Sequence, residues 1–294
     1  MLNSKDIKEL AKIAKQAALL AADYIAYHAN HSHQIVLKDG VGSLAKQVVT
    51  AIDMESQRLI LAHLKPSIAE FDFGLLTEEL VDDGSRLVKE YFWCIDPLDG
   101  TLPFTEQQYG YAVSIALVSR TGEAIIGIVI DPHQNDRYVA IKNQGVWRNE
   151  WPYKFKQPNR PESLICHFDR SFRESVEYDQ TIEDLQALCN KLNYQNLDIR
   201  TGFGAVMNAC GLLDISAGCY FKLQKSSLGG GCIWDFASTR LIYEELGLHV
   251  STINGKPLPL NNPSTSYMNN HGVIYATNLQ LGKELIQMCR TLQK

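Results

Sequence analysis

The chain has 294 residues, of which 45% are hydrophobic and 21% charged, and its net charge is −5. These values are typical of a globular protein with a sizeable core, in one large domain or two packed subdomains. The negative charge argues against a nucleic acid polymer or an anionic membrane as the main partner, although bound metal ions would still admit an anionic small substrate. The seven cysteines form no Cys-x-x-Cys pair, we find no signal peptide, and the N-terminal apolar stretch is too short to span a bilayer. We therefore expect a cytoplasmic protein with unpaired thiols.

The first half of the chain predicts two helices followed by an antiparallel sheet. Apolar residues recur at helical spacing from Ser4 to about residue 29, and a second helical pattern from Thr50 to Leu64 is expected to stop before Pro66. The polar, glycine-containing residues 31–47 predict a loop or weak hairpin, with His31 and His33 in solvent. Strands are predicted by short apolar runs and by a hairpin signature around Thr121-Gly122, at residues 73–77, 92–95, 111–118, 124–130, 138–141 and 145–147.

A polar, proline-bearing stretch from Gln157 to Glu162 is the best candidate for a boundary between subdomains. It divides an N-terminal α+β subdomain, residues 1–157, from a C-terminal α/β subdomain, residues 158–294. Beyond it, strands are predicted at 163–167, 198–200, 219–221 and 273–276, and helices at 182–192, 204–213, 234–246 and 279–292. Gly247 suits the position just after the third of these helices.

The most informative motif is Trp93-Cys94-Ile95-Asp96-Pro97-Leu98-Asp99-Gly100-Thr101. It places two carboxylates three residues apart where a buried strand is expected to end in a tight turn, because Pro97 fixes φ and Gly100 permits unusual backbone angles. Two like charges so close together repel each other, and a hard cation such as Mg²⁺ would neutralise them. The alternative is that both aspartates only accept hydrogen bonds from backbone N–H groups of the turn.

Other acidic residues lie at the edges of predicted elements. Glu78-Glu79 ends a strand, Asp53 lies in the first turn of a helix, and Asp235 opens another helix. Each of the two aspartates alone is explained by a favourable interaction with the helix dipole. Together, however, Glu78-Glu79, Asp96-Pro97-Leu98-Asp99-Gly100-Thr101 and Trp234-Asp235-Phe236-Ala237-Ser238 form an ordered set that resembles the inositol monophosphatase superfamily of metal-dependent phosphatases. The resemblance spans roughly residues 5 to 290.

The resemblance implies a layered α-β-α-β-α sandwich, with an antiparallel sheet in the N-terminal half and a mixed sheet in the C-terminal half. It also implies two or three Mg²⁺ ions, of which one is held by Glu78, Asp96 and the Leu98 carbonyl and a second by Asp96, Asp99 and Asp235. Asp53 and Thr101 would orient the attacking water, so that the implied catalytic residues are Asp53, Glu78 and Thr101. Gly100 and Thr101 would bind phosphate through backbone N–H groups at a helix start. Glu79 would act through water or support a ligand.

Two departures leave the substrate open. The signature continues as Leu102-Pro103-Phe104, which matches neither the inositol-hydrolysing nor the nucleotide-hydrolysing relatives. Before Trp234-Asp235 the chain carries Lys222, Lys225 and a Gly229-Gly230-Gly231 run, with no carboxylate between Asp214 and Asp235. The two lysines could bind a second phosphate, as in 3′-phosphoadenosine 5′-phosphate, or belong to an exposed flexible loop.

The leading hypothesis is a Mg²⁺-dependent phosphomonoesterase that acts on a small polar ester, either an inositol monophosphate or a 3′-phosphorylated nucleotide. Two metal ions can activate water without a covalent nucleophile, and the chain has no Gly-x-Ser-x-Gly elbow and no Walker loop. The alternative is a non-catalytic protein that binds or senses a phosphorylated metabolite in the same pocket. A homodimer is a further expectation, because the aromatic segment from Trp147 to Tyr153 could form an interface or belong to the core.

Overall fold

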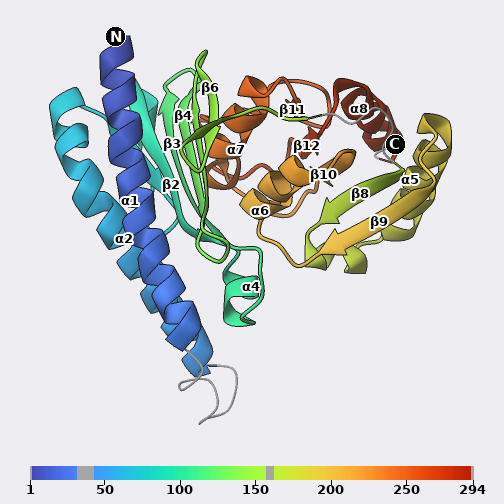
Figure 1. The fold of residues 1–294 in the computed structure, drawn as a ribbon, viewed down its shortest axis with the longest axis horizontal. Helices are drawn as coiled ribbons and strands as arrows, with labels where there is room; N and C mark the ends of the chain where they lie inside the picture. Colours follow the sequence, from blue (N-terminus) through green and yellow to red (C-terminus); the bar gives the residue numbers. More distant parts are fainter. Residues whose placement is uncertain (1, 32–42, 157–161, 293–294) are drawn as a thin grey trace.

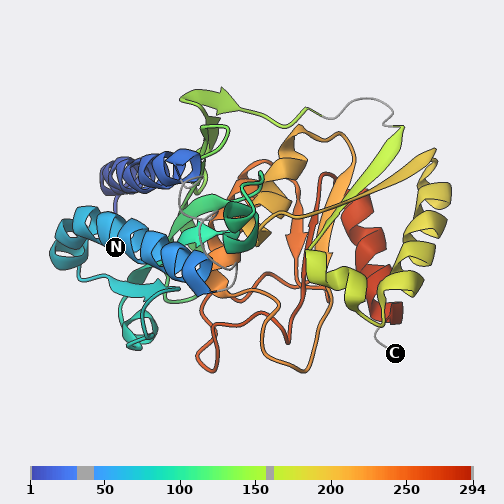
Figure 2. The same cartoon turned by 90° about the horizontal axis from the view of Figure 1, so that it is seen from below.

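The structure is a computed structural model that describes residues 2–31, 43–156 and 162–292. Its elements form five layers: a helical pair, a seven-stranded sheet, a middle helical layer, a five-stranded sheet and an outer helical pair (Figure 1). The view from below shows the two N-terminal helices side by side at one end of the molecule and the outer pair at the other end (Figure 2). The implied α-β-α-β-α sandwich is therefore confirmed.

The first sheet comes entirely from the first half of the chain. Its strand order follows the sequence from β1 to β7, and β1 is parallel to β2 whereas all later neighbours are antiparallel. The elements of this half are α1 (Ser4–His31), α2 (Ser43–Phe71), β1 (Gly74–Thr77), α3 (Ser85–Val88), β2 (Tyr91–Asp99), α4 (Thr101–Thr105), β3 (Ala112–Ser119), β4 (Ala124–Asp131), β5 (Asp136–Ile141), β6 (Gly145–Arg148) and β7 (Trp151–Tyr153).

The second sheet is mixed, as expected, with the order β11-β12-β10-β8-β9. The strand β8 is parallel to both of its neighbours, whereas β12 runs antiparallel to β10 and β11. The elements of this half are β8 (Ser163–Phe168), η2 (Arg170–Glu174), α5 (Tyr178–Leu192), β9 (Asn196–Thr201), α6 (Ala205–Cys210), η3 (Gly211–Asp214), β10 (Gly218–Lys222), α7 (Ile233–Glu245), β11 (His249–Ser251), β12 (Val273–Ala276) and α8 (Leu279–Leu292).

Three apolar cores separate the layers. One lies between α1, α2 and the first sheet, and another between the second sheet and the outer helices α5 and α8. The middle core combines residues of both halves, such as Phe92, Phe236 and Tyr275. The division into subdomains 1–157 and 158–294 stays a prediction, and residues 157–161 lie outside the described residues.

The prediction for the second helix was wrong at both ends. Residues 43–47, expected in a loop, begin α2, and the helix passes through Pro66 to Phe71. Proline lacks the N–H that a helix interior uses, but the turn around it is anchored: the Ser67 hydroxyl donates to the Leu64 carbonyl at 2.7 Å and accepts from the Trp93 indole N–H at 3.1 Å. Tertiary contacts therefore outweigh the local preference.

Other predictions differ from the structure in detail. The predicted helix 204–213 is a short α-helix followed by a 3₁₀ turn, and α3, β7 and β11 were not predicted. His31 is the last residue of α1, whereas His33 lies outside the described residues. All seven cysteines are free and buried. None of the helices in the described ranges is long and apolar enough to cross a membrane.

Candidate metal and phosphate site

Asp96 and Asp99 lie at a bulge in β2, not in a turn after it as expected. Asp96 pairs with Ser114 and Asp99 pairs with Ala112, so that β2 spans three steps where β3 spans two. In a regular strand, residues three apart point to opposite faces of the sheet. The extra residue of a bulge reverses this alternation, and it therefore directs both carboxylates to the same side.

A third carboxylate joins this pair from the second half of the chain. Carboxylate oxygens of Asp96, Asp99 and Asp235 all lie within 4.8 Å of one another, and Asp96 and Asp99 are buried. Asp235 sits in the first turn of α7, and the hydroxyl of Ser114 on β3 ties this helix to the sheet through Ser238 at 2.6 Å. The structure thus brings together three of the predicted metal ligands.

Each of the three aspartates also accepts backbone hydrogen bonds. Asp96 accepts from Leu98 N–H at 3.0 Å, and Asp235 accepts from Cys232 N–H at 2.8 Å. Asp99 accepts from Ala205 and Val206 N–H, at 3.0 and 2.8 Å, at the start of α6. Capping and metal binding are compatible here, because each carboxylate oxygen carries two lone pairs. The hydrogen bonds hold the carboxylates rigidly toward one another.

The electrostatics of this cluster favour a cation. Burial, followed by repulsion from Glu78 and Asp99, raises the pKa of Asp96 well above its usual value. The pKa of Asp99 is raised in the same way by burial and by Asp235. A bound divalent cation would reverse this repulsion, and carboxylate oxygens are the donors that Mg²⁺ prefers. The donor set therefore fits a hard divalent metal ion.

Of the remaining predicted acidic residues, Glu78 interacts electrostatically with the cluster, and Asp53 interacts with the Glu78-Glu79 pair. Burial and the charge of Asp235 raise the pKa of Glu78 to about 7, although the residue reaches the surface. Burial, then Glu79 and Glu78, raises the pKa of the buried Asp53 to about 8, and burial also raises that of Glu79. Asp53 on α2 is therefore close enough to the Glu78-Glu79 pair that follows β1 to feel both charges.

The predicted phosphate contacts, Gly100 and Thr101, follow β2 directly. Gly100 has φ of 88°, and a Cβ there would lie 2.7 Å from the Gly110 carbonyl, so only glycine fits. The exposed Thr101 opens the five-residue helix α4, with its hydroxyl 3.5 Å from the Leu98 carbonyl. That carbonyl, a predicted metal ligand, belongs to a buried residue beside the cluster.

Lys222 reaches the cluster, and its partner was missed by the sequence analysis. Its ammonium lies 2.7 Å from the carboxylate of Asp169, and its charge offsets part of the rise that burial causes in the pKa of Asp99 and Asp235. Asp169 follows β8 and Lys222 ends β10, two parallel neighbours. The carboxyl ends of parallel strands meet at one edge of a sheet. Pairing β8 with β10 would therefore have predicted that Asp169 lies close to Lys222.

Lys225 is not brought to the carboxylates. Within the described part of the chain, no ion pair joins it to the cluster, and its backbone N–H donates to the Asn269 carbonyl at 3.0 Å. The run Gly229-Gly230-Gly231 has a structural role. A Cβ at Gly231 would lie 2.6 Å from Asp235 Oδ2, so this glycine lets the backbone pass the metal-ligand candidate.

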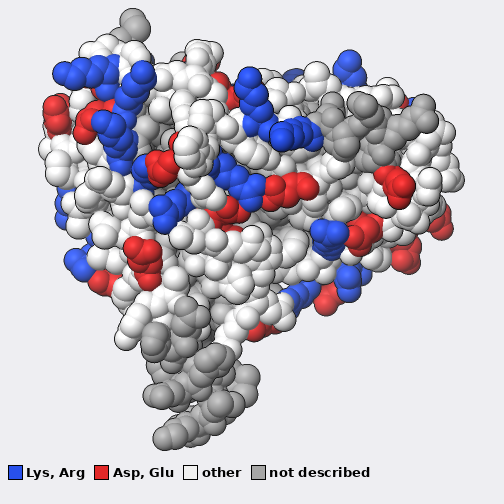
Figure 3. Space-filling view, in the orientation of Figure 1, with Lys and Arg blue, Asp and Glu red and all other residues white. Residues whose placement is uncertain are grey.

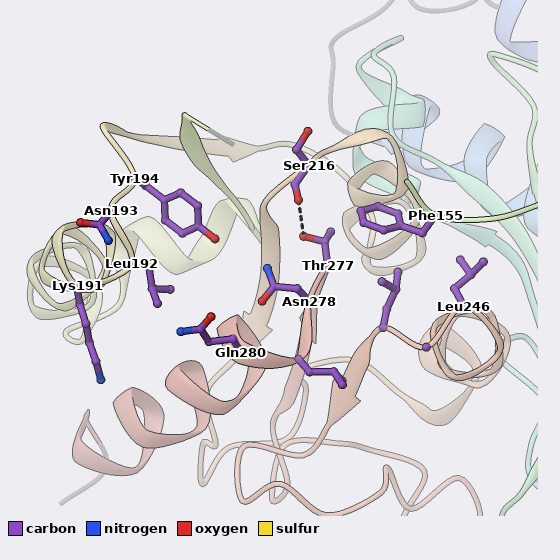
Figure 4. Close-up of a pocket in the computed structure, with 13 residues that line it drawn as sticks. Phe155, Lys191, Leu192, Asn193, Tyr194, Ser216, Leu246, Thr277, Asn278 and Gln280 are labelled. Atoms are coloured by element: carbon purple, nitrogen blue, oxygen red, sulfur yellow. Dashed lines mark hydrogen bonds between the residues drawn. The ribbon is translucent and has the colours of Figure 1, made fainter. Parts of the chain in front are cut away.

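A separate cavity of about 680 Å³ lies between the ends of α5 and β12 and the start of α8, and Phe155 from the first half of the chain also lines it (Figure 4). Its polar lining includes Asn193, Tyr194 and Asn278, and the Thr277 hydroxyl there donates to the Ser216 carbonyl at 3.4 Å. No carboxylate is among its lining residues. The volume of this cavity therefore does not point to the metal-site candidate, which is found from the grouping of the carboxylates instead.

Comparisons with known proteins identify the family of this chain. Residues 6–293 match the model of the inositol monophosphatase family. Among curated proteins, the chain is 25% identical to inositol-1-monophosphatase of Bacillus subtilis, covering 95% of this chain and 96% of that protein. It is 26% identical to 3′(2′),5′-bisphosphate nucleotidase CysQ of Escherichia coli, over 79% of this chain and 86% of the relative. It is also 27% identical to Nus factor SuhB of Xylella fastidiosa, over 86% of this chain and 85% of that protein.

The fold has solved counterparts as well. An inositol monophosphatase from Anabaena aligns with a TM-score of 0.70 at 24% identity, over 97% of this chain and 96% of that one. CysQ from Bacteroides thetaiotaomicron aligns with a TM-score of 0.72 at 21% identity, over 92% of this chain and 98% of that one. The family model matches nearly the whole length of a chain that also has the five layers and the cluster of three aspartates. This chain therefore belongs to the inositol monophosphatase family.

Proposed function

We propose that this protein is a Mg²⁺-dependent phosphomonoesterase for a small polar phosphate ester, an inositol monophosphate or a 3′-phosphorylated nucleotide. The observation that carries the proposal is the convergence of Asp96, Asp99 and Asp235, whose oxygens lie within 4.8 Å of one another. When bound, Mg²⁺ ions supply the positive charge that neutralises a phosphate and acidifies water. Phosphomonoester hydrolysis is among the slowest uncatalysed reactions, so charge stabilisation of this kind is needed.

In this proposal, each group of residues has one task. Asp96, Asp99, Asp235, Glu78 and the Leu98 carbonyl hold two metal ions. The backbone N–H groups of Gly100 and Thr101 bind phosphate oxygens, and Asp53 and the Thr101 hydroxyl orient the attacking water. Support for the water site comes from the burial of Asp53 opposite Glu78 and Glu79.

The Lys222–Asp169 pair bears on the choice of substrate. Because Asp169 already compensates the ammonium at 2.7 Å, Lys222 is a weaker receptor for a second phosphate than a free lysine. A charge pair can instead hydrogen-bond neighbouring hydroxyl groups, with the carboxylate accepting and the ammonium donating. This favours a hydroxyl-rich ester at this position. The bisphosphate nucleotide stays in the proposal because curated relatives carry the name 3′(2′),5′-bisphosphate nucleotidase.

Phosphate release from inositol 1-phosphate, 3′-phosphoadenosine 5′-phosphate and fructose 1,6-bisphosphate, with Mg²⁺ or with EDTA, tests the proposal. We expect Mg²⁺-dependent release from at least one of the three, and its loss in Asp96→Asn and Asp235→Asn. The exposed Asp23→Asn variant is the matched control for one lost carboxylate. Release that persists in Asp96→Asn would contradict the metal-ligand roles.

A non-catalytic role is the second candidate, because some relatives carry the name Nus factor SuhB. In that case the same pocket would bind a phosphorylated metabolite without turnover. A rise in melting temperature with Mg²⁺ and ester, but no released phosphate over the whole panel, would select this function.

A further inference from the structure

A groove on the opposite side of the first sheet has no role in the proposed reaction. It lies between α1 and the strands β5 and β6, and its volume is about 450 Å³. We call it the α1–β6 groove and define it by four cations, Lys8, Lys12, Lys15 and Arg137, around a floor that includes Val139 and Trp147. Asp235 comes from α7, which covers the other face of this sheet. The groove is therefore separate from the carboxylate cluster.

The groove exists because the sheet is wider than its helical cover. The helix α2 packs on β2, and α1 packs on β3, β4 and β5, whereas β6 extends beyond α1. Val139 and Trp147, paired across β5 and β6, therefore remain only half-buried on the face where neighbouring apolar residues are fully covered. An apolar floor that stays open in this way is suited to a flat apolar ligand.

The rim of the groove is positive in a protein whose net charge is −5. Lys15 is compensated by Glu150 at 2.8 Å and Lys12 by Glu9 at 3.3 Å. In the described ranges, Lys8 and Arg137 have no carboxylate partner, and the Arg137 guanidinium donates only to the Asn135 amide oxygen. Figure 3 shows Lys and Arg side chains gathered around the N-terminal half of α1. Two uncompensated cations beside an apolar floor complement an anion with an apolar body.

We infer that the α1–β6 groove is a second ligand site, for a small organic anion with a flat aromatic body. The groove volume is in the range of about 300 to 1,000 Å³ that small-molecule sites occupy. The ring system lies on Val139 and Trp147, and the anionic group faces Lys8 and Arg137. Aromatic carboxylates, sulfonates and phosphates share this chemistry.

Isothermal titration with naphthalene-1-sulfonate tests the inference, with naphthalene-1-sulfonamide as the uncharged ligand of the same shape. We expect the sulfonate to bind with one-to-one stoichiometry, and more weakly when sodium chloride is raised from about 0.05 to about 0.5 M. The Lys8→Ala/Arg137→Ala variant should bind about tenfold more weakly, because the anionic group then loses both cations of the rim that have no carboxylate partner in the described ranges. Lys65→Ala/Lys283→Ala, which removes two exposed lysines elsewhere, should bind like the wild type.

Three outcomes would overturn the inference. Equal binding of sulfonamide and sulfonate would show that charge is not recognised, and equal losses in the two double variants would show only a general electrostatic effect. Loss of sulfonate binding in Asp96→Asn, with retention in Lys8→Ala/Arg137→Ala, would place the ligand in the carboxylate cluster. None of these results depends on phosphate release, so the inference and the proposed function fail independently.

Discussion

Replacing Asp53 by asparagine should remove a loss of stability that the metal-free wild type suffers as pH rises to neutrality. Burial and the charges of Glu79 and Glu78 raise the Asp53 pKa from 3.8 to about 8, and only 6% of the residue is exposed. A carboxyl group with a raised folded-state pKa contributes stability below pH 3.8 that is lost as pH rises toward 8. From 3.8 to pH 7, at 1.36 kcal/mol per unit, this loss amounts to about 4 kcal/mol.

Urea denaturation in EDTA, followed by circular dichroism at pH 4 and pH 7, measures this effect. The Asp53→Asn variant avoids the loss, so its free energy of unfolding relative to the wild type should increase by about 4 kcal/mol between pH 4 and pH 7. The change in this free-energy difference between the two pH values does not include the effect of the amide itself on stability, because that effect is the same at both. The exposed Asp23→Asn variant should show no such increase. If the free-energy difference between Asp53→Asn and the wild type stayed constant or fell as pH rose, the raised pKa of Asp53 would be refuted.

Three further predictions follow from single contacts. Gly204→Ala would place a Cβ 2.3 Å from Asp99 Oδ2. It should lower the free energy of unfolding by about 1–3 kcal/mol and reduce the rise in melting temperature that Mg²⁺ causes. An unchanged rise would contradict the close approach. Burial lowers the pKa of His167 to about 4, so stability is present above pH 6.5 and lost as pH falls. Urea titrations at pH 7 and pH 4.5 should therefore show a wild-type loss about 2 kcal/mol larger than that of His167→Phe, and equal losses would refute the assignment. Pro66→Ala should raise the unfolding free energy by about 1–3 kcal/mol, because the exposed position in α2 regains a backbone hydrogen bond; no gain would show that α2 had already adapted to the proline.

Hydrophobic periodicity predicted most of the helices and strands because it reports local burial, whereas the five layers were implied by the family resemblance. The hairpin around Thr121-Gly122 and the helix that ends before Gly247 were both visible in short windows. Pro66 shows the limit of such windows. Its local preference ends a helix, but the hydrogen bond from Trp93 to Ser67 comes from a strand more than twenty residues away.

For the candidate site, the sequence likewise identified residues that lie in a motif but not the contacts that depend on distant parts of the chain. Asp96 and Asp99 were found from a motif, but the bulge that aligns them depends on pairing with Ser114 and Ala112. Asp169 carries no motif, and only the neighbouring positions of β8 and β10 connect it to Lys222. The expected homodimer stays a prediction; within the segment proposed as its interface, Trp151 is 77% exposed.

The hydrogen bonds of Asp99 make this residue a joint between the two halves of the molecule. Asp99 belongs to β2, but its partners, Ala205 and Val206, open α6 in the second half, and Asp235 comes from α7. Neither half alone contains the complete carboxylate centre. Fragments of the chain could therefore form the centre only by complementation, and undocking of the halves would dismantle the centre even if each half kept its own secondary structure.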